Sequence, residues 1–320
     1  MITATARPQR VLVVGLGFLG AAVGARLRSE GLGVVGLTPR PSSRTYDCAH
    51  SGVEVIYGRA EDPGILDDIL DDIDHVVYTA GGLLPVEAAD DPLRDATQMI
   101  LPWITTLEAL RSRPGIGVTL VSSGGTIYGN PTRIPVRESD PSAPISTYGV
   151  SRQACALYAG MYARTHGINV QVVRCANIYG PDQPRNRSQG VVAVFLHNIM
   201  NGIPVTVFGD GSAVRDYVYV DDVAEAITRL VCDRIPVDVV NIGSGRGHSI
   251  LEILDALIEI SGVDIEVIHA PERSHDVRAV VLDISRLRSL IDFEPVPIAE
   301  GLRRVWRHAA EDPIALVSGA

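Results

Sequence analysis

The stretch Val11-Leu-Val-Val-Gly15-Leu-Gly17-Phe-Leu-Gly20 decides the fold. It is typical of a short apolar strand that passes through a GxGxxG turn into a helix, here predicted over Phe18–Ser29. Such a turn must be tight and must let the backbone approach a pyrophosphate, and both demands favour residues without Cβ. The alternative is a purely structural turn. The residues predicted to bind a dinucleotide here are Gly15, Gly17, Phe18, Leu19 and Gly20.

Short apolar runs alternate with helical patterns through the first two thirds of the chain. Further strands are predicted at Val34–Leu37, Val53–Tyr57, His75–Thr79, Val118–Val121 and Val170–Arg174. Helices are predicted at Pro63–Leu70, Pro92–Arg111 and from about Ser146 to His166. Continuous apolar strands separated by helices indicate a parallel sheet covered on both faces. The predicted fold class is therefore α/β, a Rossmann-like doubly wound parallel sheet.

The pattern changes after Arg174. Two polar loops, Asn177 to Gly190 and Gly209 to Asp216, flank a helix at Gly190–Asn201 and a strand at Val205–Phe208. No linker separates the two regions, so we expect a small interleaved C-terminal substrate-binding lobe with a cleft against the sheet. The predicted division is a dinucleotide-binding domain over residues 1–175, its sheet completed by parts of 205–245, and a mainly substrate-binding lobe over 176–320.

Composition excludes several classes of function. The 320 residues carry 28 Lys and Arg against 38 Asp and Glu, a formal charge of −10, which argues against non-specific nucleic-acid binding. No long apolar run indicates a membrane partner, and the first ten residues lack the apolar core of a signal peptide. The four cysteines have no metal-ligand spacing, so no metal is expected and a reducing, cytoplasmic location is predicted.

The end of the second predicted strand bears on the choice of cofactor. NAD is usually held there by a carboxylate on the ribose, whereas a nearby arginine suits the 2′-phosphate of NADP. Here Thr38-Pro-Arg40 follows the strand and no carboxylate is present. Arg40, with Arg44 as a second candidate, slightly favours NADP, and NAD stays open. The alternative is that Arg40 and Arg44 are solvated loop arginines without a role in cofactor binding.

Tyr148 and Arg152 lie four residues apart at the start of a predicted helix. Residues at this spacing share one helical face, so the guanidinium can stabilise the phenolate form of the tyrosine. Such a pair is a candidate for general acid–base catalysis, with a solvated surface pair as the alternative.

Seven ordered motifs stand out along the chain: GLGFLG (15–20), SSGGTIYG (122–129), ISTYGVSR (145–152), RCANIYGP (174–181), GDGSAVRDYVYVDDVA (209–224), NIGSG (241–245) and a late Arg273-x-x-Asp276. Together they resemble the extended short-chain dehydrogenase/reductase family, of the NAD-dependent epimerase/dehydratase type, in the branch similar to UDP-glucose 4-epimerase. They span nearly the whole chain. The resemblance implies a nicotinamide cofactor and a nucleotide-diphosphate sugar.

The resemblance assigns roles in catalysis. Tyr148 takes the place of the base that exchanges a proton with a sugar hydroxyl, and Arg152 stands where the family has a lysine. The catalytic serine or threonine of the family aligns with Gly124. The nearest replacement hydroxyls are those of Ser123 and Thr126, with Ser122 more distant.

The resemblance also assigns binding residues. Along the cofactor it adds Thr38, Ala80 and Arg59, the last at a position where the family has an aspartate near the adenine. An asparagine near the nicotinamide aligns with Met99, beside Gln98.

At the nucleotide-sugar end, a guanidinium fork suits a diphosphate. By resemblance, the substrate residues are Tyr148, Asn177, Val207, Arg215 and Arg273. The alternative for Arg215 is a salt bridge with Asp216 or Asp222.

The predicted function is 4-epimerisation of a UDP- or dTDP-hexose through a keto intermediate. One alternative is an NADPH-dependent ketoreductase of a nucleotide-linked 4-keto sugar, favoured by Arg40. Another is a non-catalytic or repurposed family member, suggested by Gly124 and Arg152. The family resemblance also implies a homodimer formed through the helix that carries Tyr148. Residues of that helix that are either interface or core are Ala154, Ala156, Leu157, Met161 and Tyr162.

Overall fold

The computed structural model describes residues 8–184, 190–273 and 276–311. The strands are β1 Arg10–Val14, β2 Gly33–Thr38, β3 Glu54–Tyr57, β4 His75–Tyr78, β5 Gly117–Ser123, β6 Val170–Cys175, β7 Asn177–Tyr179, β8 Val205–Phe208, β9 Val214–Tyr219, β10 Val239–Ile242, β11 Gly247–Ser249, β12 Val267–Ala270 and β13 Ala279–Val280. The helices are α1 Phe18–Ser29, α2 Ser43–His50, α3 Ile65–Leu70, α4 Pro85–Asp90, α5 Pro92–Arg111, α6 Gly124–Ile127, α7 Thr147–His166, α8 Val191–Asn201, α9 Val220–Cys232, α10 Ile250–Ser261, α11 Ser285–Leu290 and α12 Ile298–Glu311.

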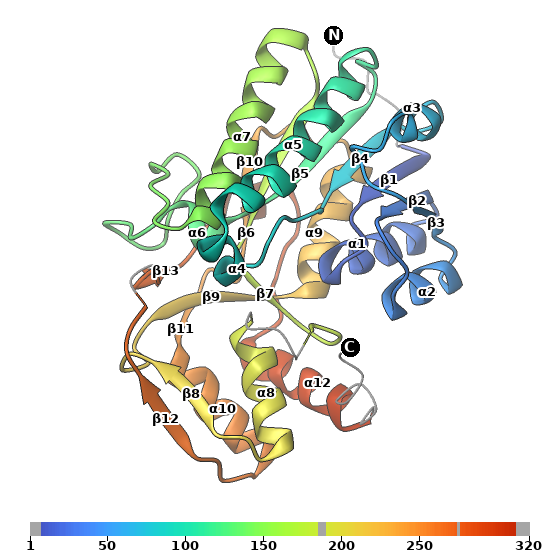
Figure 1. Cartoon of the computed structure of the whole chain (residues 1–320). Helices are drawn as coiled ribbons and strands as arrows, with labels where there is room; N and C mark the ends of the chain where they lie inside the picture. The colour runs from blue at the N-terminus through green and yellow to red at the C-terminus, as the bar shows by residue number, and fades with distance from the viewer. Residues whose placement is uncertain (1–7, 185–189, 274–275, 312–320) are drawn as a thin grey trace.

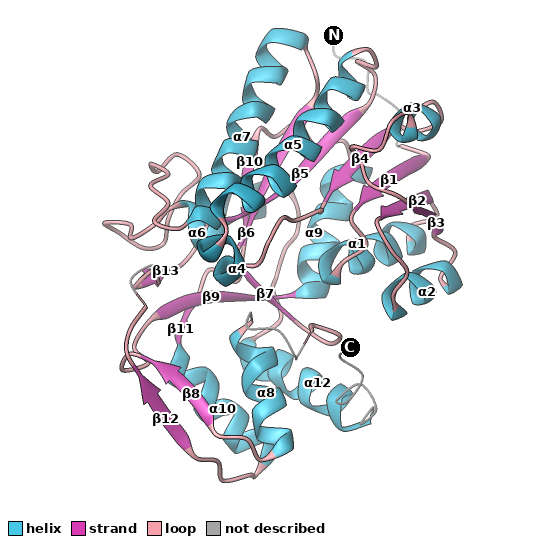
Figure 2. Ribbon diagram, in the orientation of Figure 1, coloured by secondary structure: helices cyan, strands magenta, loops and turns pink. Residues whose placement is uncertain are grey.

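A seven-stranded parallel sheet forms the larger part of the molecule (Figures 1 and 2). Its strand order is β10-β6-β5-β4-β1-β2-β3, so the direction of winding reverses between β1 and β4. Ligands of open α/β sheets bind at such a switch point, outside the carboxyl ends of the strands. The prediction of a Rossmann-like doubly wound sheet is confirmed.

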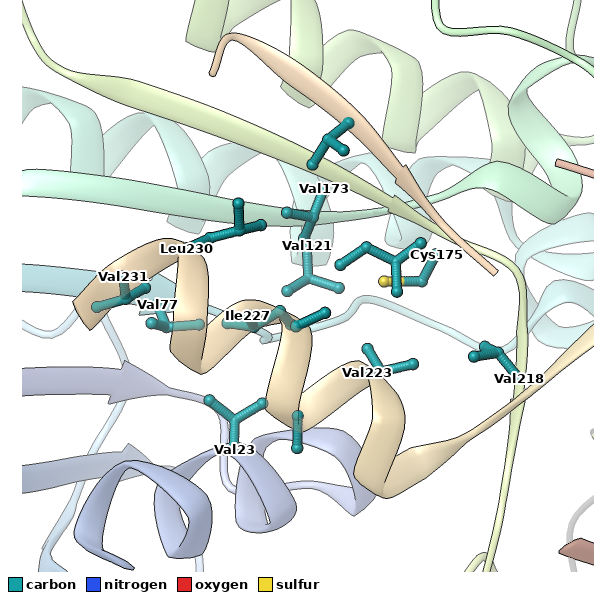
Figure 3. Packing of buried hydrophobic residues seen from close by; sticks show 14 of the residues in the cluster. Val23, Val77, Val121, Val173, Cys175, Val218, Val223, Ile227, Leu230 and Val231 are labelled. Carbon is teal, nitrogen blue, oxygen red and sulfur yellow. The ribbon is translucent and has the colours of Figure 1, made fainter. Parts of the chain in front are cut away.

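Helices cover both faces of this sheet. On one face α9 lays Ile227 and Leu230 against the strand residues Val77 and Val121, with Val23 of α1 beside them (Figure 3). On the other face α3, α5 and α7 enclose a second apolar cluster. Because both faces are covered, the central strands are largely apolar, as their sequences predicted, whereas the edge strand β3 is partly exposed.

The C-terminal lobe has its own apolar cluster, built mainly from α8, α10 and α12 around the parallel pair β8–β12. Strand β9 pairs with β7, β11 and β13 beneath the main sheet (Figure 1). Strand β10 then returns to the main sheet beside β6. The division at residue 175 remains a proposal, and the separate lobe cluster supports it.

The sequence prediction was wrong about several segments. The predicted loop from Gly209 to Asp216 contains the start of β9 at Val214, and the loop predicted from Asn177 begins with β7. Residues 185–189, within the loop predicted from Asn177 to Gly190, lie outside the described residues. Helices α2, α4 and α6 were not predicted. Within the described chain, no helix combines the length and apolarity that a membrane crossing needs.

Candidate active site

The glycine turn after β1 is held by close backbone packing. Gly15 has φ of +97°, and a Cβ atom there would lie 2.7 Å from the Cα of Ala80. A Cβ at Gly20 would collide with the Gly15 carbonyl oxygen. That oxygen accepts a hydrogen bond of 2.6 Å from the hydroxyl of Thr79. The turn therefore requires glycine at both positions, and the predicted cofactor residue Ala80 forms its outer wall.

The start of α1 fits a pyrophosphate. Its N-cap, Gly17, provides no side-chain cap, and the first turn contains no acidic residue. A Cβ at Gly17 would meet nothing within 4 Å, so the space in front of this glycine is open. Free N–H groups at a helix start attract anionic oxygens.

A cleft of about 560 Å³ opens in front of this turn, between the carboxyl ends of the strands and the lobe. It gathers most of the predicted site. The predicted residues that line it are Gly17, Phe18, Leu19, Ser123, Thr126, Tyr148, Arg152, Asn177 and Arg215, together with the second-choice candidates Arg44 and Ser122. Catalytic, cofactor and substrate candidates from distant parts of the chain thus share one cleft.

Three predicted cofactor residues lie elsewhere, at the ends of β2 and β3. Thr38 pairs in register with Tyr57, and Arg59 follows two residues later. Arg59 lies 3.6 Å from Glu61 in an exposed ion pair. Arg40 is exposed and forms no ion pair within the described part of the chain. These residues form a separate group outside the cleft lining.

Tyr148 and Arg152 stack at the start of α7. Ser146 caps this helix by accepting a hydrogen bond of 3.2 Å from the Gly149 N–H. The Arg152 guanidinium carbon then lies 4.8 Å from the centre of the Tyr148 ring, within cation–π range. Arg152 is only 8% exposed, and it has no ion pair with any residue that the structure describes. A buried cation without a counter-ion favours a polar or anionic ligand.

Hydroxyl groups face the same cleft from the end of β5 and from α6. Ser122, Ser123 and Thr126 line it, and the buried side-chain oxygens of Ser122 and Thr126 have no hydrogen-bond partner among the residues that the structure describes. Gly124 cannot be replaced without cost, because a Cβ there would lie 2.6 Å from a methyl carbon of Leu282. The site is therefore packed around glycine at this position.

Arg215 reaches the cleft from the lobe side. Its guanidinium donates to the carbonyl oxygen of Val214 at 2.9 Å, and burial lowers its pKa. No described residue forms an ion pair with it, so the predicted alternative of a bridge to Asp216 or Asp222 is wrong. Asp222 instead accepts from the Val296 N–H at 2.8 Å.

Asp216 locks β9 in place. It is 2% exposed and accepts four hydrogen bonds, two from Ser244 and one each from the N–H groups of Gly245 and Leu282. Burial raises its pKa, while these hydrogen bonds act in the opposite direction. Because side chains alternate along a strand, this anchoring directs the neighbouring Arg215 to the other face.

Sequence reasoning missed several polar residues of the cleft, among them Tyr217 and Gln183. Tyr217 lines it two positions after Arg215 and pairs in register with Asn177, and its buried hydroxyl has no partner among the described residues. Gln183 also lines the cleft, and its buried side-chain oxygen has no hydrogen-bond partner in the described part of the chain. Period-two alternation from Arg215 would have identified Tyr217 if the strand had been recognised. No local pattern pointed to Gln183.

Val207 and Arg273 occupy the lobe beyond the cleft lining. Val207 is buried in β8, so only its backbone is available to a ligand. The Arg273 guanidinium lies 3.5 Å from the centre of the Phe208 ring, and among the described residues it has no ion-pair partner. Within the same part of the chain, no group of three or more His, Cys, Asp or Glu could hold a metal ion.

The arrangement agrees with sequence comparison. Residues 11–243 match the NAD dependent epimerase/dehydratase family. The chain belongs to this family. The predicted membership of the extended short-chain dehydrogenase/reductase enzymes is thereby confirmed.

Individual relatives cover almost the whole chain. A UDP-glucose 4-epimerase of Mycolicibacterium smegmatis is 32% identical over 305 residues, which are 92% of this chain and 96% of that protein. The structure of a Thermotoga maritima UDP-glucose 4-epimerase with UDP-glucose is 31% identical, with a TM-score of 0.87 over 95% of this chain and 99% of that one. A Thermus thermophilus UDP-glucose 4-epimerase in complex with NAD is 32% identical, with a TM-score of 0.86 over 93% and 98% of the two chains.

Proposed function

We propose that this family member is an NAD(P)-dependent nucleotide-sugar 4-epimerase that acts on a UDP- or dTDP-hexose. One observation carries the proposal: Tyr148 and Arg152 face a cleft that runs from the glycine turn to Arg215. Relatives whose structures contain UDP-glucose or NAD support it.

Tyr148 is the proposed acid–base residue. A bound nicotinamide supplies reversible hydride transfer at the sugar carbon. Tyr148 accepts the proton of the hydroxyl on that carbon, and it returns a proton when the keto group is reduced. The Arg152 guanidinium, 4.8 Å from the ring centre, stabilises the negative phenolate.

Thr126 and Ser123 are proposed to replace the hydroxyl that Gly124 lacks. Both line the cleft with Tyr148. The Thr126 oxygen is buried and has no partner within the described chain, so it is available to the sugar hydroxyl. Thr126→Val removes this hydroxyl at nearly constant volume and is expected to lower turnover more than Ser123→Ala.

Arg215 and Arg273 are proposed to bind the diphosphate of the substrate. Neither guanidinium forms an ion pair with a described residue, so both are available to phosphate oxygens. Asn177 lies beside the strand that carries Arg215 and is proposed to contact the substrate near the phosphates. The backbone at Val207 is proposed to contact the base.

NADP is the proposed cofactor preference, with NAD as the alternative. The relative from Thermus thermophilus binds NAD. In this chain, Arg40 is exposed just beyond β2, where no carboxylate follows Thr38. A 2′-phosphate at this strand end would meet Arg40, with Arg59 at the adjacent strand end.

A homodimer and a cytoplasmic location belong to the same proposal. On the helices α5 and α7, Leu101, Val150 and Leu157 are more than half exposed, which suits a contact between copies. Tyr162 is buried and donates to Glu108, so it belongs to the core. All four cysteines are buried free thiols, as expected in a reducing compartment.

Two alternatives rest on specific residues. Arg40 favours a ketoreductase that uses NADPH on a nucleotide-linked 4-keto sugar. Gly124 and Arg152 favour a family member that binds ligands without catalysing the reaction.

One preparation distinguishes the three functions. The purified protein is denatured and the released dinucleotide identified, and interconversion of UDP-glucose and UDP-galactose is then assayed with NAD and with NADP. Interconversion establishes the epimerase. NADPH binding without interconversion favours the ketoreductase, and absence of both cofactor and sugar binding favours the non-catalytic protein.

A further inference from the structure

Gly81 lies against the guanidinium of Arg152. It is the third residue after β4 and directly follows Ala80, which packs against the glycine turn at Gly15. A Cβ atom built at Gly81 would lie 2.7 Å from the terminal Nη2 of Arg152, inside the distance at which one of the two groups must move. The same guanidinium also faces the Tyr148 ring, with its central carbon 4.8 Å from the ring centre.

The position of Arg152 depends on this packing because no charged partner fixes it. The side chain is 8% exposed and forms no ion pair with the described residues. A guanidinium is planar and wider than the ammonium of lysine, the residue that the family resemblance predicts here. It therefore needs lateral space, and the missing Cβ of Gly81 provides it.

We infer that Gly81 is a positioning residue, which keeps the Arg152 guanidinium beside Tyr148 by leaving open the space that a side chain would fill. The inference rests on the roles proposed above for Tyr148 and Arg152. It makes the glycine and the arginine one functional unit, in which the glycine is needed only because residue 152 is an arginine.

Folding does not require this glycine. Gly81 is exposed and does not adopt the left-handed conformation. The atom that a Cβ would meet is the far end of a flexible side chain, whereas Gly15 and Gly20 face backbone atoms. Gly81→Ala is therefore expected to displace the guanidinium and to leave the fold intact.

A double-mutant cycle tests the inference. In the natural background, Gly81→Ala is expected to lower kcat about tenfold or more, within the coupling range of residues in contact. In the Arg152→Lys background, the same change should alter kcat less than about twofold, since the ammonium is narrower.

Gly115→Ala is the control, because a Cβ there would meet nothing within 4 Å. It should leave kcat unchanged in both the Arg152 and the Arg152→Lys backgrounds. The thermal unfolding midpoints of Gly81→Ala and Gly115→Ala should both stay close to that of the natural protein. An equal loss of kcat from Gly81→Ala in the Arg152 and Arg152→Lys backgrounds would overturn the inference.

Failure of the proposed function gives a different result. A natural protein without sugar interconversion would contradict the epimerase and leave the positioning role open to a second readout. Calorimetry with NAD and NADP then applies the same cycle to dinucleotide affinity. Weaker binding after Gly81→Ala only in the Arg152 background supports the inference, and equal binding constants in all four proteins overturn it.

Discussion

Replacing Arg215 by methionine tests the proposed diphosphate site. Among the described residues, the natural guanidinium donates to the carbonyl oxygen of Val214 at 2.9 Å and, more distantly, to that of Arg278 at 3.5 Å. The charge of Asp276 opposes the lowering of the Arg215 pKa by burial, but no described carboxylate forms an ion pair with Arg215, so the protein should stay folded. The change therefore isolates the interaction with a ligand.

The expected loss follows from the energy of a charged hydrogen bond. Hydrogen bonds to charged groups contribute about 1.5–3 kcal/mol, which corresponds to about a 10- to 150-fold weaker Kd. Titration calorimetry with UDP measures this directly and needs no cofactor or turnover. Added salt should reduce the difference, because the interaction is between charges.

Arg286→Met is the matched control. Arg286 is an exposed arginine of α11 outside the cleft lining. Its replacement removes the same charge from the chain and should leave the UDP affinity unchanged. If the Kd of Arg215→Met for UDP is within about threefold of that of the natural protein, Arg215 does not bind the diphosphate. The substrate would then lie in the cleft in another orientation.

Three further changes test the site and the core. Tyr148→Phe should lower turnover about 10²- to 10⁴-fold with the dinucleotide affinity kept, and undiminished turnover would exclude Tyr148 as the base. Gly124→Ser should lower the free energy of unfolding by about 1–3 kcal/mol because the new Cβ meets Leu282 at 2.6 Å, and a variant with a higher melting temperature and higher turnover would contradict this packing. Burial lowers the pKa of His75 from 6.5 to about 3, so below pH 6.5 the unfolded chain binds a proton that the folded chain does not. The free energy of unfolding should therefore decrease as the pH is lowered from about 6.5 to about 3, by up to about 1.4 kcal/mol per pH unit. Urea unfolding of His75→Gln over this pH range should lack that contribution to the pH dependence.

Sequence pattern predicted the elements that are defined by apolar periodicity. Helix α1 occupies Phe18–Ser29 and α5 Pro92–Arg111, as predicted, because a buried helical face fixes the spacing of apolar residues. The start of β9 was missed because Arg215 and Asp216 are polar. Both are strand residues: Arg215 lines the cleft on one face, and Asp216 accepts hydrogen bonds from the 244–245 turn on the other.

The candidate site was predicted to a similar extent. Helical spacing identified Tyr148 and Arg152, and the family resemblance identified Arg215; the structure brings all three to one cleft. It did not identify Gln183 or the role of Gly81. The function of a glycine in such a place depends on which side chain lies opposite in the folded chain, and that information is not local in sequence.

The return of β10 to the main sheet determines when the cofactor-binding half can be completed during synthesis. The strand at Val239–Ile242 covers the outer edge of β6, whose residues Val170–Cys175 are buried along their whole length. As the chain emerges from the ribosome, β6 is made well before the strand that protects it. An uncovered, apolar edge strand is prone to pair with other chains. The nascent protein therefore carries an exposed sheet edge until the part of the lobe that precedes β10 has been translated, and this interval is when chaperone binding would matter most.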